Sequence, residues 1–370
     1  MRKKVLITGG AGFIGSHLAD ELIEKGYDVR ALDNLSPQVH GVAGTRPDYL
    51  HPNVELIVGD VRDKQAVKEA LQGVDAVFHF AAMVGVGQSM YQIQDYTEVN
   101  NVGTAVLLEA LIENPVKKLV VASSMSIYGE GLYKNAAGNL VQECDRTLDD
   151  LRSQKWNMYD ENGEYIPLPT PETKKPCLSS VYALSKYDQE RLCLIAGKAY
   201  NIPTTALRFF NVYGTRQALS NPYTGVLAIF ASRLLNENPP LIFEDGRQKR
   251  DFVHVTDVAR ACRLALETPE ADGEVINVGS GNQYTIVEIA EELAKVMGKD
   301  IPAQLSGKYR VGDIRHCFAD LTKAKTLLGY EPQVSFEDGL RELAEWLEGQ
   351  IAVDSVNKAA EELALRGLTV

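Results

Sequence analysis

The chain has 370 residues, of which 45% are apolar and 24% are charged, the balance of a folded globular protein rather than a fibrous, coiled-coil or disordered one. Its 50 acidic and 38 basic residues give a formal net charge of −12. No stripe of Lys and Arg offsets that charge, so we expect neither a nucleic acid nor an anionic membrane surface as a partner. The sequence contains no apolar run of about 18 residues that could form a membrane-spanning helix.

The cysteine and histidine patterns favour reduced thiols and no metal site. The five cysteines contain no CxxC pair, and the six histidines show no spacing typical of zinc ligands. We therefore expect a cytoplasmic protein without a bound metal. The cysteines are Cys144, Cys177, Cys193, Cys262 and Cys317.

The first third of the chain alternates short β-rich runs with segments that carry apolar residues at helical spacing. This alternation, with strands apolar on both faces, predicts a parallel sheet covered by helices on each side. The predicted strands are residues 5–8, 28–32, 54–58, 76–80 and 119–122. The predicted helices between them are residues 14–25, 63–71 and 104–113.

Residues 130–178 are rich in Gly, Asn, Asp and Pro, which is typical of a lid, a binding loop or a disordered segment. A helix at 180–200 and a strand at 204–209 follow, and beyond residue 211 the pattern is more mixed. We expect a nucleotide-binding domain over 1–210, with the 130–178 insertion beside the substrate pocket. A smaller, partly interleaved substrate-binding lobe is expected over 211–348, and a polar, helix-prone tail over 349–370 that we assign to neither lobe.

The first predicted strand leads into a glycine-rich turn and then a helix. Glycine permits the tight turn and lets the backbone approach a pyrophosphate at the positive N-terminal end of the helix. The placement predicts a dinucleotide site. Its expected contacts are Gly9, Gly12, Phe13, Ile14 and Gly15.

Asp33 ends the second predicted strand and is placed to accept hydrogen bonds from the adenosine ribose of such a dinucleotide. No arginine follows it in Asn34-Leu35 to pair with a 2′-phosphate, so the pattern favours NAD over NADP. Asn34 is expected beside the ribose. After the third strand, Asp60 and Val61 are expected to border the adenine ring.

Tyr182 and Lys186 stand one helical turn apart, in the sequence YALSK. A cation beside a tyrosine favours the phenolate and lowers the phenol's pKa, which makes the side chain a usable base. A YxxxK pattern alone is weak evidence. Its place after a nucleotide-binding half and after the Ser-rich segment 123–129 strengthens it.

With further blocks in the same order, the chain resembles the extended short-chain dehydrogenase/reductase family, and within it the nucleotide-sugar epimerases and dehydratases. The blocks include TGGAGFIGSHL near the start, HFAA at 79–82, SSMSIYG at 123–129, LRFFNVYG at 207–214 and RDFVHVTDVA at 250–259. The resemblance implies a Rossmann-type doubly wound parallel sheet with a smaller mixed α/β substrate-binding lobe. It also implies bound NAD and a nucleotide-diphosphate sugar as substrate.

The resemblance assigns roles to the matching residues. Ser124 would hydrogen-bond the reacting sugar oxygen, Tyr182 would be the acid and base, and Lys186 would bind the nicotinamide ribose and tune Tyr182. Further NAD-site residues would be Phe80, Ala81, Ala82, Asn100 and Phe210. The substrate would contact Ser126, and its diphosphate end would be held by Asn211, Arg250, Arg310 and Asp313. Family members commonly dimerise through paired helices, here 104–113 and 180–200, although the same spacing fits core packing.

The residues after Ser124 bear on the type of reaction. Dehydratases of the family place an acidic pair where this chain has Met125 and Ser126, and relatives that decarboxylate keep an acid nearby. Dehydration and decarboxylation are therefore disfavoured, and Asp33 argues against an NADPH-releasing reductase. The remaining reaction is 4-epimerisation. A sugar-nucleotide oxidoreductase and a non-catalytic NAD-binding module stay open as alternatives.

For the substrate, the long 130–178 insertion and the segments 36–41 and 84–91 look like the dTDP-L-rhamnose 4-epimerase branch of the family. Val84, Val86 and Met125 are either an apolar seat for the methyl group of a 6-deoxy sugar or plain core. Cys317 falls where epimerases often place a residue that limits substrate size. Its small side chain keeps UDP-glucose and UDP-N-acetylglucosamine as alternatives.

Overall fold

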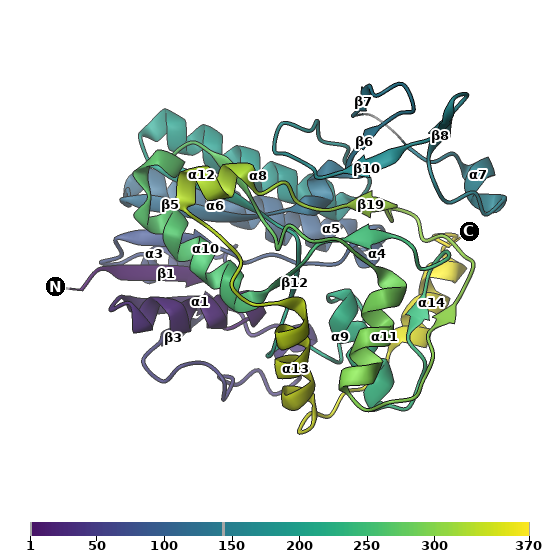
Figure 1. Cartoon of the computed structure of the whole chain (residues 1–370). Coiled ribbons are helices and arrows are strands. Elements are labelled where there is room, and N and C mark those ends of the chain that lie inside the picture. Colours follow the sequence, from purple (N-terminus) through teal and green to yellow (C-terminus); the bar gives the residue numbers. More distant parts are fainter. Residues whose placement is uncertain (1, 143–144, 370) are drawn as a thin grey trace.

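A computed structural model of the chain describes residues 2–142 and 145–369 (Figure 1). Its centre is a seven-stranded sheet with the order β16-β11-β5-β4-β1-β2-β3, in which every neighbouring pair is parallel. The strands are β1 (Lys4–Thr8), β2 (Asp28–Asp33), β3 (Glu55–Val58), β4 (Ala76–His79), β5 (Lys118–Ser124), β11 (Thr204–Phe209) and β16 (Val275–Val278).

Helices cover both faces of this sheet, each burying an apolar face against it. One face carries α1 (Phe13–Glu24), α10 (Val255–Glu267) and α12 (Thr322–Leu328). The other carries α3 (Lys64–Ala70), α6 (Gly103–Glu113) and α8 (Val181–Tyr200). The prediction of a doubly wound, Rossmann-type α/β fold is confirmed, and the predicted strands and helices of the first third occur within two residues of their expected bounds.

The strand order reverses between β1 and β4, and this reversal positions the cofactor site. Strands β2 and β3 extend the sheet to one side of β1, and β4, β5, β11 and β16 extend it to the other. Ligands of open α/β sheets bind at the carboxyl ends of strands at such a switch point. The glycine turn after β1 and the residues after β4 therefore face the same crevice.

A smaller lobe follows β11, and its own apolar core lies between three helices. These are α9 (Val226–Leu235), α11 (Ile286–Val296) and α13 (Phe336–Leu347). Short strand pairs frame it: β12 (Asn211–Tyr213) with β15 (Phe252–His254), β13 (Leu241–Ile242) with β18 (Gln304–Leu305), and β14 (Lys249–Arg250) with β17 (Tyr284–Thr285) and β19 (His316–Cys317). Strand β16 returns from this part of the chain into the central sheet, so the two parts are interleaved.

The insertion forms ordered secondary structure at one end of the molecule (Figure 1). It contains β6 (Leu132–Lys134), β7 (Leu140–Val141), α7 (Leu148–Arg152), β8 (Tyr159–Asp160), β9 (Gly163–Glu164) and β10 (Ile166–Leu168). A buried ion pair fixes it to the smaller lobe, because Arg146 lies 2.6 Å from Glu244; within the insertion Arg146 also lies 3.4 Å from Glu130. The Arg146 guanidinium also donates to the Asp313 carbonyl oxygen at 3.1 Å.

The remaining elements are short, apart from the helix of the tail. They are α2 (Pro37–His40), α4 (Val86–Ser89), α5 (Ile93–Tyr96), the π-helical turn η1 (Thr97–Val102), the 3₁₀ turns η2 (Met125–Tyr128) and η3 (Pro269–Ala271), and α14 (Val356–Leu365). Cys177, Cys193, Cys262 and Cys317 are free thiols, and Cys144 lies outside the described residues. Within the described ranges, no helix is both long and apolar enough to cross a membrane.

Candidate active site

The glycine turn after β1 is packed against the residues that follow β4. Gly9 adopts φ +71°, and a Cβ there would lie 2.9 Å from the Ala81 amide nitrogen. A Cβ on Gly15 would collide with the Gly9 carbonyl oxygen. Glycine is therefore required both by the backbone conformation and by the close approach of helix α1 to the turn. The turn leaves the N-terminus of α1 open, with Gly12 as its N-cap.

The carboxylate of Asp33 is fixed at the carboxyl end of β2. It accepts hydrogen bonds from the amides of Ala11 at 3.0 Å and Leu35 at 2.9 Å. The His40 imidazole lies 3.6 Å from the same carboxylate, and its Nδ1 is buried without a hydrogen-bond partner. His40 was not anticipated from the sequence, because the β2–β3 connection that brings it back to Asp33 carries no periodic pattern.

Arg62 is a cation near the site expected for the adenosine of the dinucleotide, and it is already paired with acidic side chains. Its guanidinium donates two hydrogen bonds of 2.9 Å to Asp60, and it lies 3.3 Å from Glu98. The hydrogen bonds from Arg62 hold the pKa of Asp60 well down, at about 2. A cation engaged in this way is a poor partner for a 2′-phosphate, which agrees with the expectation of NAD rather than NADP.

These residues line a cavity at the carboxyl ends of β1, β2 and β4. The predicted cofactor residues that line it are Gly9, Gly12, Phe13, Ile14, Gly15, Asp33, Asn34, Asp60, Val61, Phe80, Ala81, Ala82, Tyr182, Lys186 and Phe210. Asn100 is the exception, because it does not line this cavity. It is fully buried behind the cavity, where it bonds both main-chain groups of Met83 and the Ser185 hydroxyl. Asn100 thus joins the loop after β4 to α8.

Ser124 ends β5 and Tyr182 lies in the first turn of α8, whose N-cap Ser180 accepts a hydrogen bond from the Ala183 amide. The Ser124 Oγ accepts a hydrogen bond from the Ser126 amide at 3.1 Å. Burial raises the pKa of Tyr182, and the Ser124 hydroxyl opposes part of that rise. The expected lowering of this pKa by Lys186 is therefore not found in this structure.

Lys186 is bonded to another side chain in this structure. Its Nζ donates to Gln189 Oε1 at 2.7 Å, one turn further along α8, and is buried. Burial lowers the pKa of Lys186 to about 8. Gln189 in turn donates to the Thr104 hydroxyl at 3.0 Å. The sequence analysis missed Gln189, although its spacing of three residues from Lys186 is a helical neighbour position.

Behind Lys186, the buried imidazole of His79 completes a polar chain between β1 and α6. It is bonded to the hydroxyls of Thr8 and Thr104, each at 2.8 Å. Burial lowers the pKa of His79 to about 3. Folding therefore holds this ring neutral, whereas in the unfolded chain it takes up a proton near pH 6.5.

We expect the free energy of unfolding to fall as the pH drops below 6.5, because the unfolded chain then binds a proton at His79 that the folded chain excludes until about pH 3. One such group contributes a loss of about 1.4 kcal/mol between pH 7.5 and pH 5.5. Urea unfolding of the wild type and of His79→Gln at both pH values measures it. The pH-dependent decrement should be smaller in the variant by that amount, and equal decrements would contradict the assignment.

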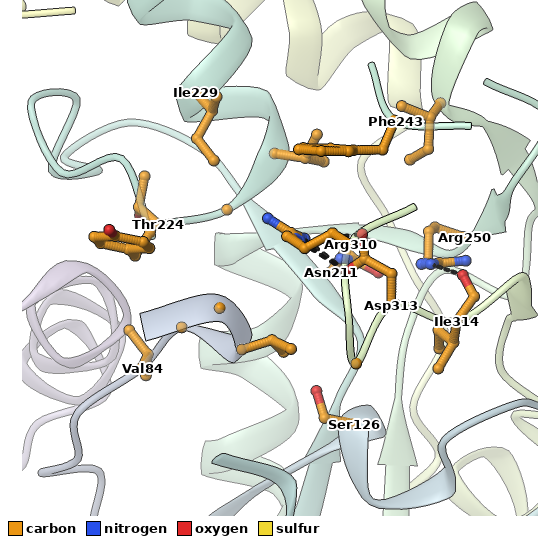
Figure 2. Close-up of a pocket in the computed structure, with 18 of the residues that line it drawn as sticks. Val84, Ser126, Asn211, Thr224, Ile229, Phe243, Arg250, Arg310, Asp313 and Ile314 are labelled. Atoms are coloured by element: carbon orange, nitrogen blue, oxygen red, sulfur yellow. Dashed lines mark hydrogen bonds and ion pairs between the residues drawn. The ribbon is translucent and has the colours of Figure 1, made fainter. Parts of the chain in front are cut away.

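A second cavity lies between the central sheet and the smaller lobe (Figure 2). The predicted substrate residues all line it: Ser124, Ser126, Asn211, Arg250, Arg310 and Asp313. Val84, Val86 and Met125 line it too, whereas Cys317 does not. Cys317 is buried in β19, with Thr170 as its neighbour, so the prediction that it limits substrate size is wrong. None of the described residues of the insertion lines this cavity either; its contact is with the loop behind Asp313.

The two cavities meet along a shared wall that includes Ser124 and Tyr182; the residues that line both are Val84, Ser124, Tyr182, Phe209, Phe210, Val212 and Thr224. Arg310 and Asn211 lie at the centre of the second cavity, between Ser126 at one end and Phe243 at the other (Figure 2). The arrangement brings a dinucleotide site and a cationic pocket together on one phenol and one serine hydroxyl.

The two arginines of the second cavity have different partners. Arg310 is ion-paired with Asp313 at 2.7 Å and lies over the Phe243 ring at 5.3 Å. Arg250 donates to the carbonyl oxygens of Lys249, Arg315 and Ile314 and forms no ion pair with the neighbouring Asp251, whose carboxylate accepts from Ser280 and Gly281. The positive charge of Arg250 therefore has no bonded carboxylate among the described residues.

Two buried amide oxygens in the same cavity, Asn211 Oδ1 and Gln248 Oε1, have no hydrogen-bond partner. The Gln248 amide is oriented by its Nε2, which donates to the Phe243 carbonyl oxygen at 2.8 Å. Buried acceptors without donors are rare in folded proteins, and in a cavity they are satisfied by water or by a ligand.

Comparison with known proteins agrees with this geometry. Residues 5–145 and 156–279 match the NAD dependent epimerase/dehydratase family. The dTDP-L-rhamnose 4-epimerase of Burkholderia thailandensis is 36% identical over 350 residues, which cover 93% of this chain and 95% of that protein. The chain belongs to the NAD dependent epimerase/dehydratase family.

Solved structures of similar proteins extend the comparison. The UDP-glucose 4-epimerase of Thermotoga maritima, solved with UDP-glucose, is 32% identical, with a TM-score of 0.76 and coverage of 93% of this chain and 98% of that one. The UDP-glucose 4-epimerase of Thermus thermophilus, solved with NAD, is 31% identical, with a TM-score of 0.74 and coverage of 94% and 100%.

Membership of this family makes the protein an NAD-dependent enzyme, and the first cavity fits that cofactor. The open N-terminus of α1 would hold the pyrophosphate, the fixed carboxylate of Asp33 would hold a ribose, and Tyr182 and Lys186 would lie at the nicotinamide end. When bound, NAD supplies the acceptor and donor of a hydride. The acid–base chemistry is left to side chains of the chain itself.

Proposed function

We propose that the protein is a nucleotide-sugar 4-epimerase. The observation that carries this proposal is the meeting of the cofactor cavity and the cationic pocket at Ser124 and Tyr182. Tyr182 takes the proton of the sugar 4-hydroxyl as C4 is oxidised, and returns a proton when hydride is delivered to the other face of the sugar. Ser124 holds the reacting oxygen. Lys186 would hold the nicotinamide ribose, and its charge beside the phenol would then favour the phenolate of Tyr182.

The chemistry of the pocket favours epimerisation over dehydration. Met125 and Ser126, the two residues after Ser124, carry no carboxylate, and both line the cavity. Of the described residues that line it, Asp313 is the single carboxylate, and it is paired with Arg310. Removal of a hydroxyl needs a free acid and base beside the sugar, and the pocket offers none besides Tyr182.

The cations at the centre of the pocket support a sugar-nucleotide substrate. Arg250 and Arg310 hold the diphosphate, with the Asn211 amide between them. Both guanidinium groups can donate charge-assisted hydrogen bonds to phosphate oxygens. A diphosphate anchored in this way leaves the keto sugar free to turn about its link to the phosphate. Both faces of C4 can then reach the cofactor, which is what inversion demands.

For the substrate we propose the conversion of dTDP-L-rhamnose into dTDP-6-deoxy-L-talose. The Burkholderia relative supports it, as do Val84 and Val86 in the pocket wall, where a 6-methyl group has an apolar seat. Gln248, beside Phe243 at the end away from Ser126, offers its unpaired oxygen to the imide N–H of a thymine or uracil. The Thermotoga structure with UDP-glucose supports the second candidate, a UDP-glucose or UDP-N-acetylglucosamine 4-epimerase.

A proton NMR time course without added cofactor tests the proposal. We expect the 6-deoxy-L-talose form to appear from dTDP-L-rhamnose, because NAD is regenerated in each cycle. If galactose signals appear instead from UDP-glucose in a parallel sample, the proposed substrate is wrong and the proposed 4-epimerisation stands. Stoichiometric consumption of added NAD would identify an oxidoreductase, and no turnover of either sugar with NAD bound would point to a binding module.

We further propose a cytoplasmic homodimer that pairs through α6 and α8. Apolar side chains on the outer surface of these two packed helices support this, among them Ile112, Leu184, Leu192 and Ile195. A pair of such helices from two copies would cover these side chains in a four-helix contact. Sedimentation of the purified protein measures its oligomeric state.

A further inference from the structure

The C-terminal segment, residues 352–369, lies against the substrate cavity. Its helix α14 contributes four side chains to the cavity lining, Val356, Ala359, Ala360 and Leu363. Leu363 is buried and sits against Gly87 of α4, where a Cβ on the glycine would lie 3.5 Å from both methyl carbons of the leucine. The same position on Gly87 is 3.9 Å from Cδ of Arg310. The helix therefore faces the part of the cavity where Arg310 lies.

The segment is fixed before the helix. Asp354 is ion-paired with Arg233 of α9 at 3.2 Å, and both side chains are buried. Arg233 also donates to the Asn357 side chain at 2.8 Å, and Asn238 donates to Asp354 at 2.7 Å. A buried, hydrogen-bonded pair of this kind holds α14 in one position.

The segment is fixed after the helix as well. The Val311 amide donates to the Leu368 carbonyl oxygen at 2.9 Å, and Arg310 and Thr369 form an antiparallel bridge. The last described residues therefore pair with the backbone of the loop that carries Arg310. Removing them would take both of these backbone contacts away from that loop.

We infer that the C-terminal segment is a wall of the sugar-nucleotide site that determines substrate affinity; this rests on the proposed function of the cavity. Its four cavity-facing side chains are apolar and offer no hydrogen bonds, so they exclude water from the sugar and diphosphate rather than bind a polar group. Exclusion of water strengthens the attraction between Arg310 and a phosphate. None of the described residues of the segment lines the cofactor cavity, so its effect is confined to the sugar nucleotide.

Ala360 gives the sharpest test, because it lines the cavity and is half-buried, whereas Ala364, one turn further along α14, is exposed and does not. We expect Ala360→Trp to raise KM for the sugar nucleotide at least about tenfold, since a filled pocket wall excludes a ligand of fixed shape. Bound NAD, released by acid and quantified, should be unchanged. The matched control, Ala364→Trp, should keep KM within about twofold of the wild type.

A second arm uses a chain that ends after residue 350. We expect it to retain NAD and to lose affinity for the sugar nucleotide by more than Ala360→Trp does, because it lacks both the wall and the support of the Arg310 loop. If the shortened chain does not fold, the comparison of Ala360→Trp with Ala364→Trp alone tests the inference. An unchanged KM in Ala360→Trp, an equal rise in both variants, or a parallel loss of NAD would each overturn the inference.

The probe separates this inference from the proposed function. KM is measured with whichever sugar nucleotide the wild type converts. If the wild type converts neither dTDP-L-rhamnose nor UDP-glucose, the proposed function fails, and calorimetric dissociation constants for dTDP are compared in the same variants. A weaker dTDP affinity in Ala360→Trp alone then still supports the wall, and equal affinities overturn it.

Discussion

Tyr182→Phe is expected to lower kcat by about 10²–10⁴-fold, the usual contribution of a general acid–base group. The phenol stands where the two cavities meet, and in the proposed mechanism it moves the proton to and from the sugar oxygen. Loss of the hydroxyl removes that step and leaves the ring in its edge-on packing with Tyr96. The measurement is the initial rate of sugar interconversion at saturating substrate.

The readout that separates chemistry from folding is the NAD content of the purified variant, which should equal that of the wild type. Tyr96→Phe is the matched control, because its phenol donates to the carbonyl oxygens of Val84 and Gly85 and lines neither cavity. It should retain most of kcat. A Tyr182→Phe enzyme with near-normal kcat would remove Tyr182 from the mechanism.

Arg250→Met should lower kcat/KM for the sugar nucleotide by about 100-fold, because loss of one partner from a buried charge pair costs about 2–5 kcal/mol. The methionine retains much of the side-chain volume, so the effect reports on charge. Among the described contacts Arg250 bonds only carbonyl oxygens, which leaves its charge for a diphosphate. Steady-state kinetics and the dissociation constant of dTDP measure the change.

Arg247→Met is the control for Arg250→Met. Arg247 lies three residues earlier, is exposed and does not line the cavity, so its loss alters the net charge equally without touching the site. The salt dependence of dTDP binding should fall only in Arg250→Met. Equal effects of the two variants would show that Arg250 acts through the overall field rather than by contact.

The parts of the fold that follow from local pattern could be predicted from the sequence. Strands β1 and β4 contain the continuous apolar runs Val5–Ile7 and Ala76–Phe78, because both faces of a parallel sheet are covered, and such runs have clear bounds. Strand β16 is only Val275–Val278 and contains the polar Asn277, whose amide is satisfied by Tyr128 and Thr170 far away in the chain. The local sequence therefore does not predict a strand at these four residues.

The candidate site shows the same division. Motif residues such as Asp33 and Tyr182 lie at ends of elements with regular patterns, so their meeting in one crevice could be expected. The buried position of Asn100 and the ion pair between Arg146 and Glu244 depend on side-chain contacts made over separations of 85 and 98 residues. Gln189 lies only three residues from Lys186, but helical spacing alone does not show that the two side chains are bonded. The C-terminal segment is the hardest part to place, because its helical pattern predicts a helix but not the cavity that α14 faces.

Interleaving by β16 limits how this molecule can be divided. A fragment ending at residue 210 would leave the outer edge of β11 unpaired, and an exposed apolar edge strand is a template for association with other chains. During synthesis the seven-stranded sheet cannot be completed until residue 278 has left the ribosome, well after the glycine turn that follows β1 has been synthesised. Exchange of the smaller lobe between relatives by recombination would therefore work only where the crossover points leave β16 with the sheet that it completes.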